Sequence, residues 1–328
     1  MKQQILTMLR TADGYLSGQE ICEKLNVSRT TVWKIIKQLQ KQGYEIEGIK
    51  NRGYRLLSTP DILTAEEIKS QMGTDSFVDQ VLYFPVTDST NIQARQCAEK
   101  EDSDRLLVVA NEQTKGRGRM GRHWDSLPEE NIFMSLLLKP KINPKSASML
   151  TIIAALAVTA AIRENTDLES WIKWPNDIVI NKKKVCGILT EMNSELDYIH
   201  YVIIGIGINV NTIVFPEEIA QTATSLLLES EKKQRFSRSQ LLCSVMAFMK
   251  KYYEKFLETQ DLSLVKEEYN QRLAGLGEQV KVLRDKTECI GISRGITKTG
   301  QLIVEYSDGS KEEIFSGEVS VRGLYGYV

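Results

Sequence analysis

The order of the apolar runs between residues 81 and 208 limits the fold of this 328-residue chain more than any other feature. Helical periodicity appears between and after these runs, at residues 90–99, 146–165 and 238–258. Because neighbouring strand-like runs are separated by short loops, the pattern predicts an α+β domain with a mainly antiparallel or mixed sheet. The runs typical of strands are VLYF, LLVVA, IFMSLLL, IVI, VCGILTEM and YIHYVIIGIGI.

A charge-free apolar stretch, Met149 to Ile162, lies within the second helical segment. It is shorter than the roughly 18 residues that span a bilayer, so we expect a buried helix and no membrane association. The N-terminus has no apolar signal segment. The five cysteines are scattered without a CxxC pair, and the histidines are only two, His123 and His200. We therefore expect reduced thiols in core positions, a cytoplasmic location and no structural metal site.

The net charge of the chain, -1, hides an asymmetry between its two ends. Residues 1–60 hold 10 Lys and Arg against 5 Asp and Glu, a net of +5. The remaining 268 residues carry 32 against 38, a net of -6. The basic N-terminal segment is thus a candidate for nucleic-acid binding, which the total charge alone would have argued against.

The N-terminal segment has the pattern of three helices followed by a hairpin. Ile5, Met8 and Leu9 predict a first helix, Ser17 can cap a second over 18–25, and Ser28 can cap a third that ends near Gly43. Two short alternating runs, YEIEGI and GYRLL, predict a basic wing. The residues that we expect to face DNA are Ser17, Gln19, Ser28, Arg29, Thr30, Thr31, Trp33, Lys34, Lys37, Lys50 and Arg52. The alternative is a helical protein-interaction module with a solvated basic face.

A linker at 58–61 precedes a second domain that starts near residue 64, where Thr64 and Glu67 form a capping box. In that domain the loop 116–122, GRGRMGR, satisfies the GxGxxG pattern. A dinucleotide fold is excluded by its context, because HWDSLP at 123–128 cannot open an amphipathic helix. Glycines and arginines suit a loop that closes over a phosphate or carboxylate, with Trp124 as a stacking surface. An RGG-like segment or a plain mobile loop is the alternative.

Three other segments could bind a ligand or serve only the fold. Lys184 follows KWPND at 173–177 and borders a buried strand, so its amine could enter a pocket; a solvated turn is the alternative. The glycines of GIGIN at 205–209 admit a ligand or a backbone, or mark a bulge. The segment DSTN at 88–91 either caps a helix, the commoner explanation, or binds a polar head group.

The sequence lacks a P-loop, a GxSxG elbow, an HExxH motif and a histidine near a candidate nucleophile. Chemistry that needs a histidine base is therefore excluded. What remains is chemistry driven by positive charge and positioning, such as attack of a carboxylate on a nucleotide phosphate.

These motifs, GRGRMGRHW, KWPND, Lys184-x-x-Gly187, GIGIN and DSTN, resemble in order and spacing those of the bifunctional biotin protein ligases that also repress the biotin operon. The resemblance covers essentially the whole chain. It implies a winged helix-turn-helix domain at 1–60, a catalytic domain at 64–274 related to class II aminoacyl-tRNA synthetases, and an SH3-like domain at 275–328. Strand-rich runs and a turn at Asp308-Gly309 in the last segment agree with this.

The resemblance also implies roles for single residues. Arg119 and Arg122 would close over the adenylate, Lys184 would bind the biotin carboxylate and then the phosphoryl oxygen, and Asp177 is a candidate base. Met120 departs from the family, which often has Arg there. The biotin-binding residues would be Ser89, Thr90, Asn91, Gln113, Gly116, Arg117, Gly118, Arg119, Lys184 and Gly187, and the residues for ATP would be Arg119, Arg122, Trp124, Lys173, Asn176, Asp177 and Asn209.

The implied activity is the formation of biotinyl-5'-AMP from biotin and ATP with Mg²⁺, followed by transfer to a lysine of a biotin carboxyl carrier protein. The adenylate form would dimerise and bind operator DNA. Three alternatives remain: a ligase for lipoate or another acid, a biotin sensor without catalysis, and a helix-turn-helix factor with an unrelated second domain.

Overall fold

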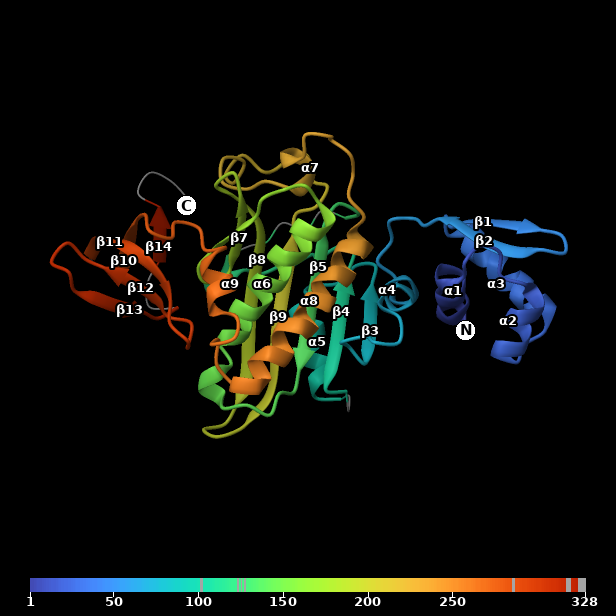
Figure 1. The fold of residues 1–328 in the computed structure, drawn as a ribbon, viewed down its shortest axis with the longest axis horizontal. Coiled ribbons are helices and arrows are strands. Elements are labelled where there is room, and N and C mark those ends of the chain that lie inside the picture. The colour runs from blue at the N-terminus through green and yellow to red at the C-terminus, as the bar shows by residue number, and fades with distance from the viewer. Residues whose placement is uncertain are drawn as a thin grey trace. The chain divides into compact units, whose positions relative to one another are not determined.

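The structure is a computed structural model that describes residues 1–100, 103–122, 124, 126, 128–284, 287–316 and 320–323 (Figure 1). The chain divides into two compact units. The first comprises Met1–Ser76 and Ser237–Cys243, and the second comprises Phe77–Phe236 and Ser244–Val328.

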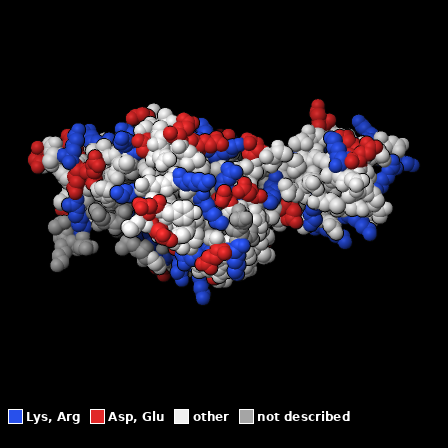
Figure 2. Space-filling view, turned by 90° about the horizontal axis from the view of Figure 1, so that it is seen from below, with Lys and Arg blue, Asp and Glu red and all other residues white. Residues whose placement is uncertain are grey.

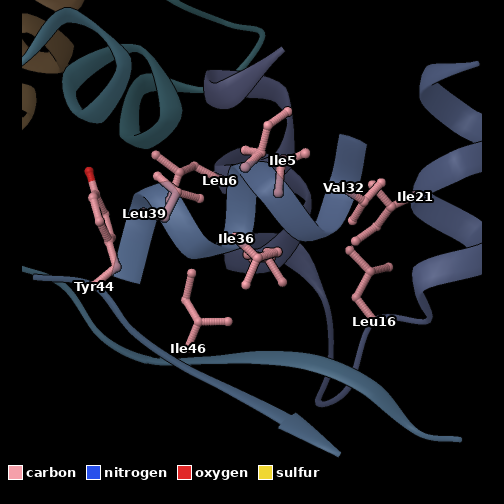
Figure 3. Packing of buried hydrophobic residues seen from close by; sticks show 11 residues of the cluster. Ile5, Leu6, Leu16, Ile21, Val32, Ile36, Leu39, Tyr44 and Ile46 are labelled. Carbon is pink, nitrogen blue, oxygen red and sulfur yellow. The ribbon is translucent and has the colours of Figure 1, made fainter. Parts of the chain in front are cut away.

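The first unit contains the predicted three helices and wing. Helices α1 (Lys2–Thr11), α2 (Gly18–Leu25) and α3 (Arg29–Lys41) are followed by the antiparallel hairpin of β1 (Glu45–Ile49) and β2 (Gly53–Ser58). The hydroxyl of Ser17 accepts hydrogen bonds from the backbone at Gln19 and Glu20, and that of Ser28 accepts one from Thr31, so both predicted caps are confirmed. The apolar faces meet in one core, which includes Ile5, Ile21, Val32, Ile36, Leu39 and Ile46 (Figure 3).

Helix α4 (Ala65–Met72) belongs to this first unit and packs on α1. Thr64 caps it by accepting from the backbone N–H of Glu67, as predicted. The second bond of the predicted capping box, from the backbone N–H of Thr64 to the carboxylate of Glu67, is wrong. That carboxylate is fully buried and accepts from Arg10, Tyr44 and Gln71 instead. Arg10 and Tyr44 lie far from Glu67 in the sequence, and Gln71 lies four residues away on the same helix; together these three donors outweigh one local backbone bond.

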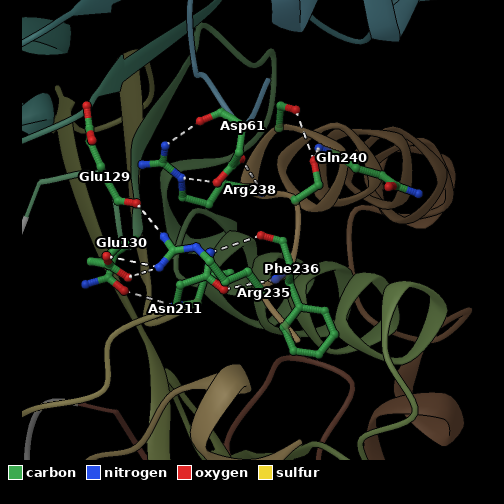
Figure 4. Close-up of polar contacts among 12 residues, drawn as sticks. Asp61, Glu129, Glu130, Asn211, Arg235, Phe236, Arg238 and Gln240 are labelled. Atoms are coloured by element: carbon green, nitrogen blue, oxygen red, sulfur yellow. Dashed lines mark hydrogen bonds and ion pairs between the residues drawn. The ribbon is translucent and has the colours of Figure 1, made fainter. Parts of the chain in front are cut away.

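The start of α8 (Arg238–Thr259) also lies in the first unit. The buried side chain of Arg238 donates to the carboxylate of Asp61 at 2.8 Å and to its carbonyl at 2.7 Å. In the second unit, just before this point, Arg235 donates to Glu130 and to the carbonyl of Glu129, while Asn211 binds the backbone N–H of Phe236 (Figure 4).

A seven-stranded mixed sheet forms the centre of the second unit. Its order is β3 (Gln80–Phe84), β4 (Arg105–Ala110), β5 (Ile132–Leu138), β9 (Ile199–Ile208), β8 (Lys183–Ser194), β7 (Asp177–Ile180) and β6 (Trp171–Lys173). Only β3 and β4 pair in parallel among these described strands. The predicted α+β class and mixed sheet are thus confirmed.

Helix α5 (Thr90–Ala98) packs on β4, β5 and β9, and α6 (Met149–Asn165) packs on β6 to β9. The segment Pro144–Asn165 is long and apolar enough to cross a membrane, but most of it is buried in the fold. A helix that is apolar on all sides must be buried. Burial is what the sequence predicted for α6. The short elements β6, α7 (Leu226–Glu229) and α9 (Lys266–Asn270) were not predicted.

The C-terminal part of the second unit is an antiparallel five-stranded sheet. Its order is β13 (Lys311–Ile314), β12 (Leu302–Glu305), β11 (Thr287–Ile296), β10 (Gln279–Arg284) and β14 (Ser320–Gly323). The turn predicted at Asp308-Gly309 joins β12 to β13, with Gly309 at φ +81°. All five cysteines are described and are free thiols. Cys186 is buried, Cys22 and Cys97 are partly buried against core clusters, and burial raises the pKa of the Cys243 thiol, so these four agree with the expected core placement. Cys289 is partly exposed on β11.

Candidate active site and DNA interface

A cavity in the second unit brings together residues from all the loop motifs. It is formed by the start of α5, the loop after β4, the KWPND turn, and strands β5, β8 and β9. The residues that line it are Ser89, Thr90, Asn91, Gln113, Arg117, Gly118, Arg119, Trp124, Met134, Asn176, Lys184, Gly187, Ile188, Leu189, Gly205, Ile206 and Gly207.

One end of the cavity is polar and lies at the first turn of α5. Ser89 is the N-cap residue, yet within the described residues its hydroxyl makes no capping bond. Instead, the amide oxygen of Gln113 accepts from the backbone N–H of Thr90 at 2.8 Å and from its hydroxyl at 3.1 Å. Capping alone therefore does not explain the DSTN motif. The hydroxyl of Ser89 lines the cavity.

Asp88 stiffens the same turn from outside the cavity lining. Burial disfavours its ionised form, but hydrogen bonds from Gln93, the backbone of Ser89 and the hydroxyl of Thr87 outweigh burial and lower the pKa of Asp88. A carboxylate that accepts three hydrogen bonds fixes the loop from which Ser89 and Thr90 project.

The glycine- and arginine-rich loop folds back on itself. The backbone N–H of Trp124 donates to Gly116, and that of Gly118 donates to Arg122, around a 3-10 turn at Arg119–Gly121. His123, Asp125 and Leu127 belong to the HWDSLP segment that excluded a dinucleotide fold, and they lie outside the described residues. The side chain of Met120 lies outside them too. The loop places Arg117 and Arg119 at the cavity, with the guanidinium of Arg119 donating to Asn176 at 2.8 Å.

Lys184 enters the cavity, as the sequence suggested. Its amine lies 2.6 Å from the carboxylate of Asp177 and 5.3 Å from the ring centre of Trp124. Its neighbours Lys182 and Lys183 are exposed at the hairpin turn. Behind it, burial raises the pKa of the Cys186 thiol, so this cysteine packs as a neutral group and is not a nucleophile.

The glycines of the motifs make room for two side chains. A Cβ atom on Gly207 would lie 2.7 Å from the indole of Trp124, and one on Gly187 would lie 2.8 Å from it. A Cβ on Gly205 would overlap the amide oxygen of Asn91. Strands β8 and β9 pair in regular register here, and their irregularity lies at Asn193/Ser194. The bulge interpretation of GIGIN is therefore wrong.

Five of the expected ligand-binding residues are not in the lining formed by the described residues: Gly116, Arg122, Lys173, Asp177 and Asn209. Arg122 is exposed, and Asn209 donates to the carbonyl of Thr224. Sequence reasoning missed Met134, the apolar residues of β8 and β9, and Ser135, which binds Asn91 from behind. These residues sit inside ordinary strand patterns, so no local signal distinguishes them.

In the first unit, a groove runs between α3, the start of α2 and the wing. Of the residues expected to face DNA, it is lined by Ser17, Gln19, Arg29, Trp33, Lys37, Lys50 and Arg52. The remaining four, Ser28, Thr30, Thr31 and Lys34, are not in its lining as the described residues form it. Lys and Arg side chains lie on the surface of this unit together with Asp and Glu side chains (Figure 2), and Trp33 is 52% exposed on α3. An exposed tryptophan among cations fits a surface that contacts bases and phosphates.

Comparison with known families identifies the domains that contain the cavity and the groove. The profile of the biotin/lipoate A/B protein ligase family matches residues 83–209. That of an HTH domain matches residues 2–55, and that of the biotin protein ligase C-terminal domain matches residues 275–322.

Relatives extend the match to the whole chain. The chain is 36% identical over 322 residues to the bifunctional ligase/repressor BirA of Bacillus subtilis, with 98% of each chain covered. It is 28% identical over 307 residues to that of Escherichia coli, covering 93% of this chain and 92% of the other. The fold is similar to biotin protein ligase from Aquifex aeolicus in complex with biotin and ATP, with a TM-score of 0.65 and 32% identity, over 75% of this chain and 99% of that one.

Proposed function

Since the chain belongs to the family of bifunctional ligase/repressor proteins, we propose that it activates biotin with ATP, transfers it to a lysine of a biotin carboxyl carrier protein, and represses transcription as the adenylate complex. The observation that carries the catalytic half is the cavity. Its lining includes the polar residues Ser89 and Gln113, apolar residues of β8 and β9, two cations, Lys184 and Arg119, and the amide of Asn176. Asp177 pairs with Lys184 from outside the lining.

In the first step, a carboxylate oxygen of biotin attacks the α-phosphorus of ATP, and pyrophosphate leaves with the electron pair of the broken P–O bond. Two anions must meet, so positive charge is the main requirement. Lys184, at the start of β8, and Arg119, in the loop after β4, supply it. Each is already held by a neighbour, Lys184 by Asp177 and Arg119 by Asn176. Preorganised cations of this kind stabilise the charge that develops in the transition state.

Mg²⁺ is the metal that such a reaction with ATP requires, and it usually binds through one or two carboxylates and the phosphates themselves. The donor set fits this, because Asp177 offers a carboxylate and Asn176 an amide beside the cavity. When bound, the ion would neutralise phosphate charge. A role of Lys173 and Asn209 in ATP binding rests on the resemblance and stays a proposal.

In the second step, the ε-amine of the acceptor lysine attacks the acyl carbon of the mixed anhydride, and AMP leaves. Asp177 is our candidate base. Its carboxylate pairs with the amine of Lys184. This ion pair supports a role of Asp177 in positioning Lys184 more directly than a role in accepting a proton. The folded loop 116–124 supports exclusion of water from the anhydride.

The groove of the first unit supports operator binding, with α3 in the major groove and the wing on the adjacent backbone. We propose that the adenylate-bound form is a homodimer, so that two such units meet two half-sites, and that the protein acts in the cytoplasm without membrane association. Five free thiols support a reducing compartment. The division into domains at 1–60, 64–274 and 275–328 also stays our proposal, supported by the three matched ranges.

The catalytic proposal is tested by ATP–pyrophosphate exchange with biotin or lipoate as the acid, followed by mass spectrometry of a biotin carboxyl carrier domain. We expect biotin-dependent exchange and a mass increase on one carrier lysine. Exchange with lipoate alone would identify a lipoate ligase. Biotin binding without exchange would identify a sensor that does no chemistry.

The DNA-binding half is tested with duplexes selected from a random pool in the presence of biotin and ATP. We expect selection of a near-palindrome whose affinity needs both ligands and falls steeply with salt. Failure to select any sequence, or an affinity that does not change with salt, would leave a protein-interaction module as the better account of the first unit.

A further inference from the structure

A line of polar residues leads away from the polar end of the cavity into the sheet. Arg95 pairs with Glu191 at 2.8 Å, and Glu191 accepts from the amide nitrogen of Asn91 at 2.8 Å. The hydroxyl of Ser135 donates to the amide oxygen of Asn91 at 2.6 Å and lies 2.7 Å from the hydroxyl oxygen of Thr90. Arg95, Glu191 and Ser135 do not belong to the cavity lining formed by the described residues, whereas Asn91 and Thr90 do.

The direction of every bond in this line follows from its charged end. A carboxylate can only accept, so Glu191 makes Asn91 point its NH₂ group outward and its oxygen inward. The oxygen then needs a donor, and the single proton of Ser135 supplies it. Gly205 is where the oxygen of Asn91 fits, because a Cβ atom there would overlap it.

The bond from Ser135 to Asn91 determines the orientation of the Thr90 hydroxyl. Since the proton of Ser135 is used on Asn91, the proton of Thr90 goes to Ser135 or to Gln113, whose oxygen is 3.1 Å away and also accepts from the backbone of Thr90. In both cases the hydroxyl of Thr90 turns a lone pair, and not its proton, towards the cavity. An acceptor at this position recognises a ligand head group that carries an N–H.

The links in this line differ in strength. Arg95 and Glu191 keep 48% and 35% of their side chains exposed, and ion pairs of that kind contribute little. The bond between Glu191 and Asn91 is charge-assisted, and Asn91 is only 7% exposed. Ser135 is fully buried. Glu191 and Ser135 should therefore matter more than Arg95.

We propose that Glu191 and Ser135 are positioning residues, which act through Asn91 to make Thr90 an acceptor for an N–H of the acid substrate. This rests on the proposed function, because biotin carries two urea N–H groups and lipoate carries none. Neither residue touches the reacting carboxylate. The expected effect of changing them is on the affinity for biotin and not on the rate at saturation or on the KM for ATP.

The test breaks the bond between Asn91 and Glu191 and then restores it with donor and acceptor exchanged. Asn91→Asp places two carboxylates face to face, which repel each other. We expect the Kd and KM for biotin to rise at least ~10-fold, equivalent to about 1.4 kcal/mol. In the double variant Asn91→Asp with Glu191→Gln, the new amide donates to the carboxylate introduced at position 91, while Ser135 still donates to it from the other side. We expect this variant to return to within ~3-fold of the wild-type Kd, since the repulsion between the two carboxylates is removed.

Glu191→Gln alone is expected to have a small effect, because the glutamine oxygen can still accept from Asn91. Ser135→Ala provides a second route if Asn91→Asp folds poorly. It removes the donor to Asn91, and we expect a similar loss of biotin affinity. Glu195→Gln, at an exposed carboxylate of the same hairpin that pairs with His200, is the matched control and should leave the Kd unchanged.

Two results would overturn the proposal while the wild type still shows biotin-dependent exchange. One is an Asn91→Asp variant that binds biotin normally. The other is a double variant that is no better than Asn91→Asp, with both folded by thermal melting. A wild type without any biotin-dependent exchange would instead remove the proposed function, and the positioning role with it.

Discussion

The groove of the first unit and the cavity of the second both depend on cations, but they hold them differently. In the groove, Arg29, Lys37, Lys50 and Arg52 are exposed, and Trp33 stands among them. In the cavity, the side chain of Lys184 is 27% exposed and bound to a carboxylate that is 13% exposed. Exposed cations act together through counterion release, so each one contributes a similar small share. A cation fixed at a reacting centre acts singly, and its loss has no substitute.

The difference between a fixed and an exposed cation can be tested on two neighbouring lysines of the second unit. We expect Lys184→Ala to slow biotin-dependent ATP–pyrophosphate exchange by roughly 10²- to 10³-fold, because one preorganised charge at a developing anion is worth that much. Lys183→Ala is the matched control, since Lys183 is exposed at the same hairpin. Equal rates for the two variants would show that Lys184 acts only as part of a diffuse positive field.

The first unit also contains two buried charged residues, Glu67 and Arg238, so the contrast between the two units is not complete. Glu67 is 0% exposed and accepts from Arg10, Tyr44 and Gln71. Glu67→Ala leaves these donors without an acceptor, so we expect this unit to lose about 3 kcal/mol of stability, measured by urea denaturation. Glu66→Ala, at the exposed neighbouring position, should change little. Biotin-dependent exchange should stay within a factor of two, and a large loss of exchange would contradict this.

Periodicity and motif order predicted most of the elements and most of the cavity. Buried runs such as β5, and the apolar residues of α3 at i, i+3, i+4 and i+7, leave little choice of structure. What failed depends on partners far along the chain. Glu67 was assigned to a local capping bond, but its partners Tyr44 and Arg10 lie 23 and 57 residues away. Strand β6 has three residues, too few for a period to be detected.

The same limit applies inside the cavity. The motif residues were identified because loops with Gly, Arg and Lys are unusual, but Ser135 and Glu191 lie in strands whose pattern is ordinary. For the GIGIN glycines, the sequence left three reasons open: a nearby ligand, a nearby backbone or a bulge. The structure supplies the reason, because Asn91 and Trp124, from two other segments, occupy the space above them.

Gly207→Ala tests whether that space matters. The added methyl would lie 2.7 Å from the indole of Trp124, so the ring must move. We expect a loss of roughly 10-fold in kcat/KM for biotin, since displacement of a cavity wall misplaces the substrate. In a Trp124→Ala background the same substitution should add almost nothing. If the glycine change costs as much there as in the wild type, the clash with Trp124 is not its cause.

The smallest expected effect belongs to a single cation of the groove, and it tests the idea that these cations act as a sum. Lys37 lines the groove and is exposed on α3. Lys37→Ala should weaken DNA binding by about 3-fold at fixed salt and reduce the slope of log K against log salt by about 0.9, the value for one phosphate contact. The loss should be equal for the selected duplex and for random DNA, because phosphate contacts carry no sequence information. Lys41→Ala, exposed one turn further along α3 and absent from the lining of the groove, should leave the slope unchanged. A loss confined to the selected duplex would mean that Lys37 contacts a base, and that the groove holds at least one cation singly, as the cavity does.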